Sequence, residues 1–132
     1  MTYGLSVTID RDFDAVLADL TPALAEQGFG IVSEIDMQQT LRTKIGVEIE
    51  PHMILGACNP GFAHRSLEIE PSLGLLLPCN VVVRRAGGAT VVEAIDPQVL
   101  VDLTGNPGMA QLASEVSERL QAVLDGVSAS GG

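Results

Sequence analysis

The chain has 132 residues, of which 46% are hydrophobic, and seven basic against 17 acidic side chains give it a formal net charge of -10. This length suits one domain with an aliphatic core that needs no disulfide for its stability. The scarcity of basic residues argues against a nucleic-acid partner, and the acidity disfavours binding to an anionic membrane surface.

The first elements alternate between strand and helix. Residues 4–9 alternate apolar and polar side chains, which predicts a strand. Apolar residues at helical spacing follow; Gly28 is placed to end this helix, and Pro22 is expected to kink it because proline removes a backbone donor. Residues 29–35 alternate again and predict a second strand.

The middle of the chain predicts two helices on either side of a third strand. Residues 37–45 are expected to form a short helix with Asp36 as its N-cap, and residues 52–57 a strand. Asn59 followed by proline is typical of the start of a helix, and Pro71 is expected to end that helix.

The last part of the chain predicts a hairpin and a long helix. Residues 74–84 form an almost wholly apolar run, and the glycine pair at 87–88 is expected to turn this strand into another over residues 90–95. Asn106 followed by proline marks the start of the last helix, and Gly126 its expected end.

The element order is therefore β-α-β-α-β-α-β-β-α. A hairpin beside long amphipathic helices predicts an α+β fold, a single domain over residues 1–126 with a mainly antiparallel sheet packed against helices. Residues 127–132 are expected to be a disordered tail. The start of the chain lacks the features of a signal peptide, and its longest apolar run is too short to cross a bilayer, so we expect a cytoplasmic protein without a membrane span.

Both cysteines are followed by asparagine and lie beside a proline, in LGACNPGFAH and LLPCNVVV. Cys58 is expected just before a helix, whose N-terminus would stabilise a thiolate, so it is the better nucleophile candidate. Cys79 lies in an apolar run and is expected to be a small, unreactive hydrophobe. We expect Asn59 to cap the helix and Asn80 to be buried, with its amide bonded to backbone near Cys58.

The only two histidines, His52 and His64, fall in the same segment as the cysteines. His64 lies about a turn and a half into the predicted helix beside Cys58, so a Cys–His pair is within geometric reach. Zinc could in principle be held by Cys58, Cys79, His52 and His64, but their spacing matches no known zinc motif and we expect no metal or other cofactor. No hydrolase signature or nucleotide-binding loop is present in the sequence.

From Ile54 to Val83 the chain closely resembles the domain of unknown function 302 family, small bacterial and archaeal proteins, and the likeness extends over about residues 1–125. The resemblance implies a compact α+β domain with a curved antiparallel sheet, commonly a homodimer, and no assigned reaction. The motif residues that carry over are Cys58, Asn59, Pro60, Pro78, Cys79 and Asn80.

Three functions remain open at this point. The leading hypothesis is a non-catalytic, homodimeric ligand-binding or interaction module, with a small-molecule pocket near Cys58, Asn59, Cys79 and Asn80. Purely structural Cys-Asn motifs come second. A thiol-dependent or metal-dependent activity centred on Cys58, with His64 as the base, comes third.

Overall fold

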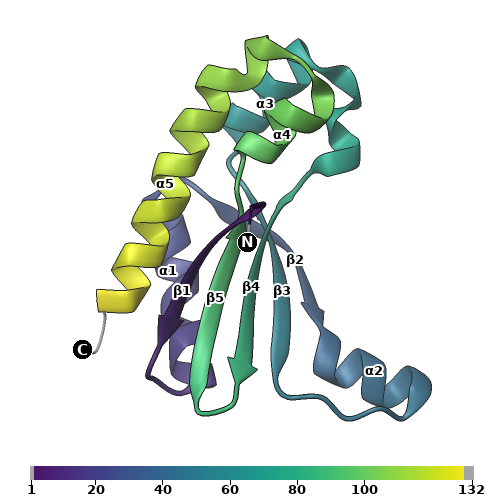
Figure 1. Cartoon of the computed structure of the whole chain (residues 1–132), viewed down its shortest axis with the longest axis vertical. Coiled ribbons are helices and arrows are strands. Elements are labelled where there is room, and N and C mark those ends of the chain that lie inside the picture. The colour runs from purple at the N-terminus through teal and green to yellow at the C-terminus, as the bar shows by residue number, and fades with distance from the viewer. Residues whose placement is uncertain (1, 130–132) are drawn as a thin grey trace.

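Five strands form one antiparallel sheet in the order β1-β5-β4-β3-β2 (Figure 1). The computed structural model describes residues 2–129. Every pair of neighbouring strands is antiparallel, and the sheet packs against helices, so the predicted α+β fold and the order of its principal elements are confirmed. The strands are β1 (Gly4–Ile9), β2 (Gly30–Asp36), β3 (His52–Cys58), β4 (Cys79–Ala86) and β5 (Ala89–Ile95).

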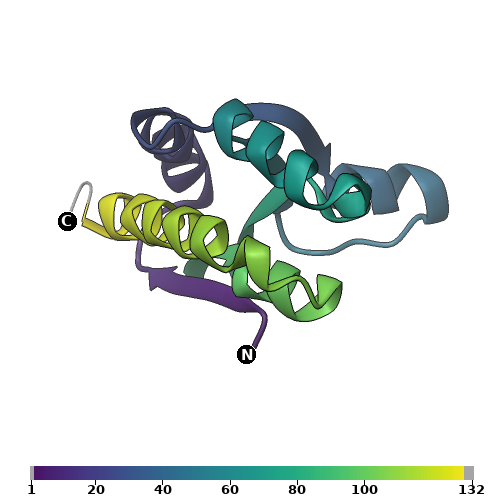
Figure 2. The same ribbon diagram turned by 90° about the horizontal axis from the view of Figure 1, so that it is seen from above.

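The helices gather on one face and at one end of this sheet. Helices α1 (Phe13–Glu26) and α5 (Ala110–Ala129) lie on the same side of strand β1 when the molecule is seen from above (Figure 2). Helices α3 (Pro60–Ile69) and α4 (Gln98–Thr104) lie beyond the end of the sheet where β3 finishes and β4 starts (Figure 1). Helix α2 (Met37–Ile45) extends from the end of β2, away from the other helices.

The core lies between the sheet and helices α1 and α5, and it is almost entirely aliphatic. Strands present every second side chain to the helices, because their side chains alternate between the two faces. The one buried aromatic side chain of this core is Phe29. The buried sheet residues are Ile9, Leu55, Ala57, Cys79, Val81, Val83, Val92 and Ala94, and they meet Val16, Leu20, Leu24, Val116, Leu120, Val123, Leu124 and Val127 of the helices.

No helix of residues 2–129 covers the opposite face of the sheet, which we call the free face (Figure 1). A cross-strand row on this face pairs Ile35 with Ile54, Ile54 with Val82, and Val82 with Glu93. Glu93 also accepts a hydrogen bond of 2.8 Å from the guanidinium of Arg84. The free face therefore combines aliphatic side chains with one paired set of charges.

Helix α1 ends in the glycine-dependent turn that its sequence predicts. The N–H of Gly28 donates to the carbonyl of Ala25 at 3.0 Å, and the N–H of Phe29 donates to that of Leu24 at 2.9 Å. Gly28 has a φ of 83°, the left-handed conformation this motif requires. Helix α1 continues through Pro22, from Phe13 to Glu26, and Pro22 is exposed.

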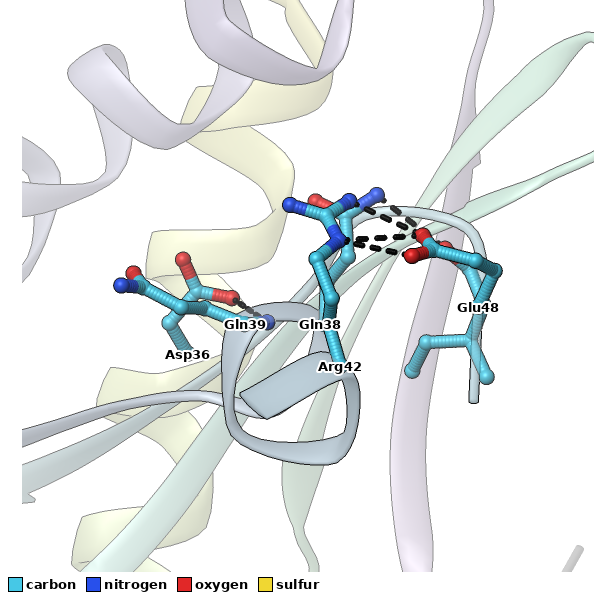
Figure 3. A network of polar contacts seen from close by, with 6 residues as sticks. Asp36, Gln38, Gln39, Arg42 and Glu48 are labelled. Atoms are coloured by element: carbon cyan, nitrogen blue, oxygen red, sulfur yellow. Dashed lines mark hydrogen bonds and ion pairs between the residues drawn. The ribbon is translucent and has the colours of Figure 1, made fainter. Parts of the chain in front are cut away.

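Helix α2 forms an arm that polar contacts fix in place (Figure 3). Asp36 accepts from the N–H of Gln39 at 2.9 Å, as expected of the predicted N-cap, and Gln38 donates to the carbonyl of Ile49 at 3.1 Å. Arg42 donates to both carboxylate oxygens of Glu48, and this hydrogen bonding lowers the pKa of Glu48. None of the residues of α2 is buried, so the arm depends on these exposed contacts.

The apolar run of residues 74–84 is shorter as a strand than its composition predicts. Residues Pro71–Leu76 form a 3₁₀ helix, and β4 begins only at Cys79. Leu76 and Leu77 of the run pack against a second, smaller cluster of Leu73, Leu100 and Met109, so this part of the run contacts that cluster instead of entering the sheet. Periodicity does not separate a buried strand from a buried helical turn in such a run.

The end of the chain also differs from expectation. Helix α4 was not predicted, although Asp96 accepts from the N–H of Gln98 at 3.0 Å at its start and Gly105 closes it with a φ of 61°. Helix α5 continues through Gly126 to Ala129, because Val127 is fully buried against the core. Residues 127–129, which were expected to belong to a disordered tail, are therefore helical, and residues 130–132 of that expectation lie outside the described part of the chain.

Candidate ligand-binding cavity

A cavity of about 350 Å³ lies between the end of the sheet and helices α3, α4 and α5. Its floor is the end of β3 and the start of β4, with Ala57, Cys58, Pro78 and Cys79. Its roof comes from apolar side chains on the helices: Phe62, Ala63 and Leu67 of α3, Leu100 of α4, and Leu112, Ala113 and Val116 of α5. The cavity therefore lies where the two Cys-Asn segments meet.

The sheet register brings the two cysteines together. Ala57 pairs with Cys79 across strands β3 and β4, so Cys58 lies diagonally beside Cys79. Both are free thiols that line the cavity; Cys58 is half-buried and Cys79 is buried, with 8% of its surface exposed. Burial, and to a lesser extent the neighbouring Cys58, raises the pKa of the Cys79 thiol to about 11. Cys79 is thus a neutral thiol at physiological pH, in agreement with the expectation that it behaves as a small hydrophobe.

Asn59 joins the cavity wall to the start of helix α3. Its side-chain oxygen accepts from the N–H of Phe62 at 3.2 Å, which confirms the predicted N-cap. Its amide nitrogen faces the turn after α1, where a Cβ atom built on Gly28 would lie only 2.8 Å away. The absence of a side chain at Gly28 therefore leaves room for Asn59, whose amide packs against the α1–β2 turn.

Asn80 lies on the other side of the sheet from Cys79. It is exposed on the free face, where it pairs across strands with Gly56 and borders a shallow hollow beside Tyr3. The expectation that Asn80 is buried and bonds near Cys58 is wrong, because successive residues of a strand point to opposite faces. Only the cysteine of the second Cys-Asn motif reaches the cavity.

Gly56 allows Pro78 to pack tightly against β3. A Cβ atom at Gly56 would clash with the hydroxyl of Ser33 and would lie 2.7 Å from Cγ of Pro78. The proline ring that precedes Cys79 therefore rests on bare backbone. This contact gives Pro78, a residue of the predicted motif, a defined structural role at the edge of the cavity.

The histidines lie apart from the cysteines. His64 is on the outer side of α3, with 78% of its side chain exposed and its Nε2 3.1 Å from Glu68, and it does not line the cavity. His52 begins β3 and pairs with Arg84, at the opposite end of the strand from Cys58. Within residues 2–129, no three or more histidine, cysteine, aspartate or glutamate side chains are grouped so that they could hold a metal ion.

Sequence patterns did not reveal most of the cavity wall. Ser66, which is only 8% exposed and lines the cavity, carries no signal beyond its position in α3. Leu100 reaches the cavity from the unpredicted helix α4, whereas Met109 lies in the 3₁₀ turn Pro107–Met109, within the segment predicted as the buried stripe of the last helix. The apolar stripe of the last helix was recognisable as a buried face, but the space left beneath it depends on packing across the whole fold.

The chain matches the family model described as "Domain of unknown function DUF302" over residues 5–127. It is similar to the crystal structure of an uncharacterised conserved DUF302 protein from Bacillus stearothermophilus, with a TM-score of 0.90 and 28% identity. That alignment covers 96% of this chain and 99% of the other. No curated protein matches the chain. Across residues 2–129, no helix has the length and apolar character needed to cross a membrane.

Proposed function

The chain belongs to the DUF302 family, and we propose that it is a non-catalytic binding module that holds a small molecule in the cavity beside Cys58 and Cys79. The cavity itself carries this proposal. Its volume of about 350 Å³ falls in the range of small-molecule sites, and its wall is mostly apolar with a few polar groups, as is usual for such sites. The exposed position of His64 supports a binding role over proton-transfer chemistry.

The experiment is a titration with N-phenyl-1-naphthylamine, an uncharged dye that fluoresces in apolar surroundings. We expect saturable binding to the wild-type protein and its loss in Ala113→Phe, because Ala113 is a buried cavity residue of α5. Ala122→Phe, at an exposed position of the same helix, is the matched control and should bind normally. Thermal melts establish that each variant is folded, and Ala63→Leu fills the same space if Ala113→Phe does not fold.

Binding that is unchanged in a folded cavity-filled variant, or that is absent from the wild-type protein, would exclude this site. Under the alternative in which Cys-Asn motifs are structural only, no apolar probe binds saturably. Cys58→Ala then lowers the free energy of unfolding and has no other effect.

We also propose that the protein is a homodimer that pairs through the free face. The row from Ile35 through Ile54 to Val82 is aliphatic, and Ile35 remains 45% exposed. Light scattering after size exclusion should give twice the chain mass for wild type and the chain mass for Val82→Lys. Ala122→Lys, on the helical side, is the control and should remain dimeric. A monomeric wild-type protein would contradict this part of the proposal.

A thiol-dependent activity at Cys58 is the second candidate, and one observation favours it. Cys58 is half-buried and lines the cavity, so a ligand there would meet a thiol that solvent also reaches. This alternative predicts that an apolar electrophile such as 1-octen-3-one adds to Cys58: the sulfur bonds to the terminal alkene carbon, the carbon–carbon double bond is consumed, and the thiol proton ends on the carbon next to the carbonyl. The mass then increases by that of the whole ligand, and Cys58→Ser abolishes the increase. A binding module predicts that Cys58→Ser retains the ligand without any mass change.

A further inference from the structure

We propose that the cavity selects an uncharged, mainly hydrocarbon ligand with a single hydrogen-bonding end, and that this end pairs with the hydroxyl of Ser66. This inference rests on the proposed binding function and adds the chemical class of the ligand.

None of the described residues that line the cavity is an aspartate, glutamate, lysine, arginine or histidine. The Cys79 thiol on its floor is neutral as well, since burial raises its pKa to about 11. A charged group moved from water into such surroundings loses its hydration without gaining an opposite charge. The cavity therefore disfavours carboxylates, phosphates and ammonium groups alike.

Two guanidinium groups lie near the cavity, but both have partners outside it. Arg65 and Arg119 stack on the ring of Phe62, at 4.8 and 5.3 Å from its centre. Arg65 forms an ion pair of 3.0 Å with Glu115, and Arg119 donates to the carbonyl of Gln27 at 3.2 Å. These contacts hold the phenyl ring in the roof and leave the two charges on the outer surface.

The polar groups of the cavity wall differ in whether they already have a hydrogen-bond partner within the protein. The side-chain oxygen of Asn59 is occupied by its helix cap, and its amide faces Gly28. No hydrogen bond joins the hydroxyl of Ser66 to another described residue, and since no fully buried side-chain oxygen among these residues lacks a partner, this hydroxyl is open to the solvent of the cavity that Ser66 lines. A hydroxyl can donate one hydrogen bond and accept two, so Ser66 can donate to an alcohol, ether or carbonyl oxygen and can also accept from an alcohol.

The volume limits the ligand to a small one. Because a water molecule takes up about 30 Å³ in the liquid, about 350 Å³ corresponds to roughly a dozen water molecules. A medium-chain alcohol or a similar compound of about ten non-hydrogen atoms fits this space. A dinucleotide is too large for this space, and the phosphate of a sugar phosphate is too polar for it.

The test is displacement of N-phenyl-1-naphthylamine at pH 7.5 by four compounds with the same chain: 1-octanol, 1-chlorooctane, octanoate and octylamine. We expect 1-octanol to bind at least tenfold more tightly than either charged compound. Ser66→Ala should weaken 1-octanol about fivefold, the usual effect of one neutral hydrogen bond. It should leave 1-chlorooctane unchanged, and the exposed Ser114→Ala is the matched control.

Two results would overturn the inference while leaving the binding function intact. The first is dye binding that Ala113→Phe abolishes but that octanoate or octylamine displaces as well as 1-octanol does. The second is folded Ser66→Ala protein with unchanged affinity for 1-octanol. Failure of the dye to bind the wild-type cavity overturns the binding function and the ligand class together.

Discussion

The ionisation of Cys79 gives a sharp test of how the cavity floor is built. In Cys58→Ser protein, Cys79 is the only thiol, and burial, the main cause of its raised pKa, is retained while the smaller effect of Cys58 is lost. The pKa of about 11 in the wild-type protein corresponds to about 0.1% thiolate at pH 8, against about 24% for an ordinary cysteine of pKa near 8.5. Ionisation alone should therefore slow alkylation by iodoacetamide by a factor of about 200. Burial slows it further, because the reagent must reach a residue that is only 8% exposed.

The assay is the rate of mass increase by intact mass spectrometry between pH 7 and 10.5, with Cys79→Ser protein as the matched sample in which only Cys58 reacts. We expect Cys79 to be silent in folded protein and to react at the ordinary rate in urea. A reaction of native Cys79 with a midpoint near pH 8.5 would refute the reasoning, since it would mean that the thiol is neither buried nor desolvated.

The raised pKa of Cys79 also makes the stability of the protein depend on pH in a defined direction. The folded state binds the thiol proton more tightly than the unfolded state, so this stabilisation is complete below the ordinary pKa of cysteine. It is lost as the pH rises toward 11, and a difference of about two pKa units corresponds to about 3 kcal/mol. Urea unfolding at pH 8 and pH 10.5 should show a larger loss for wild type than for Cys79→Ala. Equal losses would contradict this linkage.

Three further predictions concern the turns and caps. Gly28→Ala should lower the free energy of unfolding by about 1–2 kcal/mol, measured by urea unfolding, because alanine is strained in the left-handed conformation. Gly46→Ala has the same backbone strain, but its added methyl group meets no atom within 4 Å, so it should lower the free energy of unfolding by less than Gly28→Ala does. Equal losses of stability in the two variants would mean that Gly28→Ala makes no clash with Asn59. Asn59→Ala should cost about 1 kcal/mol through its lost cap, whereas Asn59→Asp should retain stability. Arg42→Gln should raise the carboxyl pKa of Glu48 in an NMR titration, and an unchanged value would show that their hydrogen bonds do not persist in solution.

Local signals in the sequence were enough to predict most of the fold. Asp36 and Asn59 cap the helices expected of them, and Gly28 ends α1, because each acts on backbone groups within a few residues. The hairpin of β4 and β5 likewise follows from its glycine turn and apolar alternation. These features depend on neighbours in the chain, which a single sequence displays.

The cavity depends on contacts that a single sequence does not display. That Cys58 and Cys79 meet follows from the register of β3 with β4, and the exposure of Asn80 follows from the point at which β4 begins. Both require that the apolar run be divided at Pro78 between a helical turn and a strand. The run has no periodicity that marks this division, so the face on which Asn80 lies could not be assigned from sequence.

The most direct test of the account is an NMR titration of the wild-type protein with 1-octanol, with methyl and amide signals assigned. We predict saturable shifts at the cavity wall, at the methyl groups of Met109, Leu67 and Val116, and no shift at Val82 or Ile54 on the free face. The absence of saturable shifts, or shifts confined to the free face, would contradict the claim that the space beside the two cysteines is a ligand site.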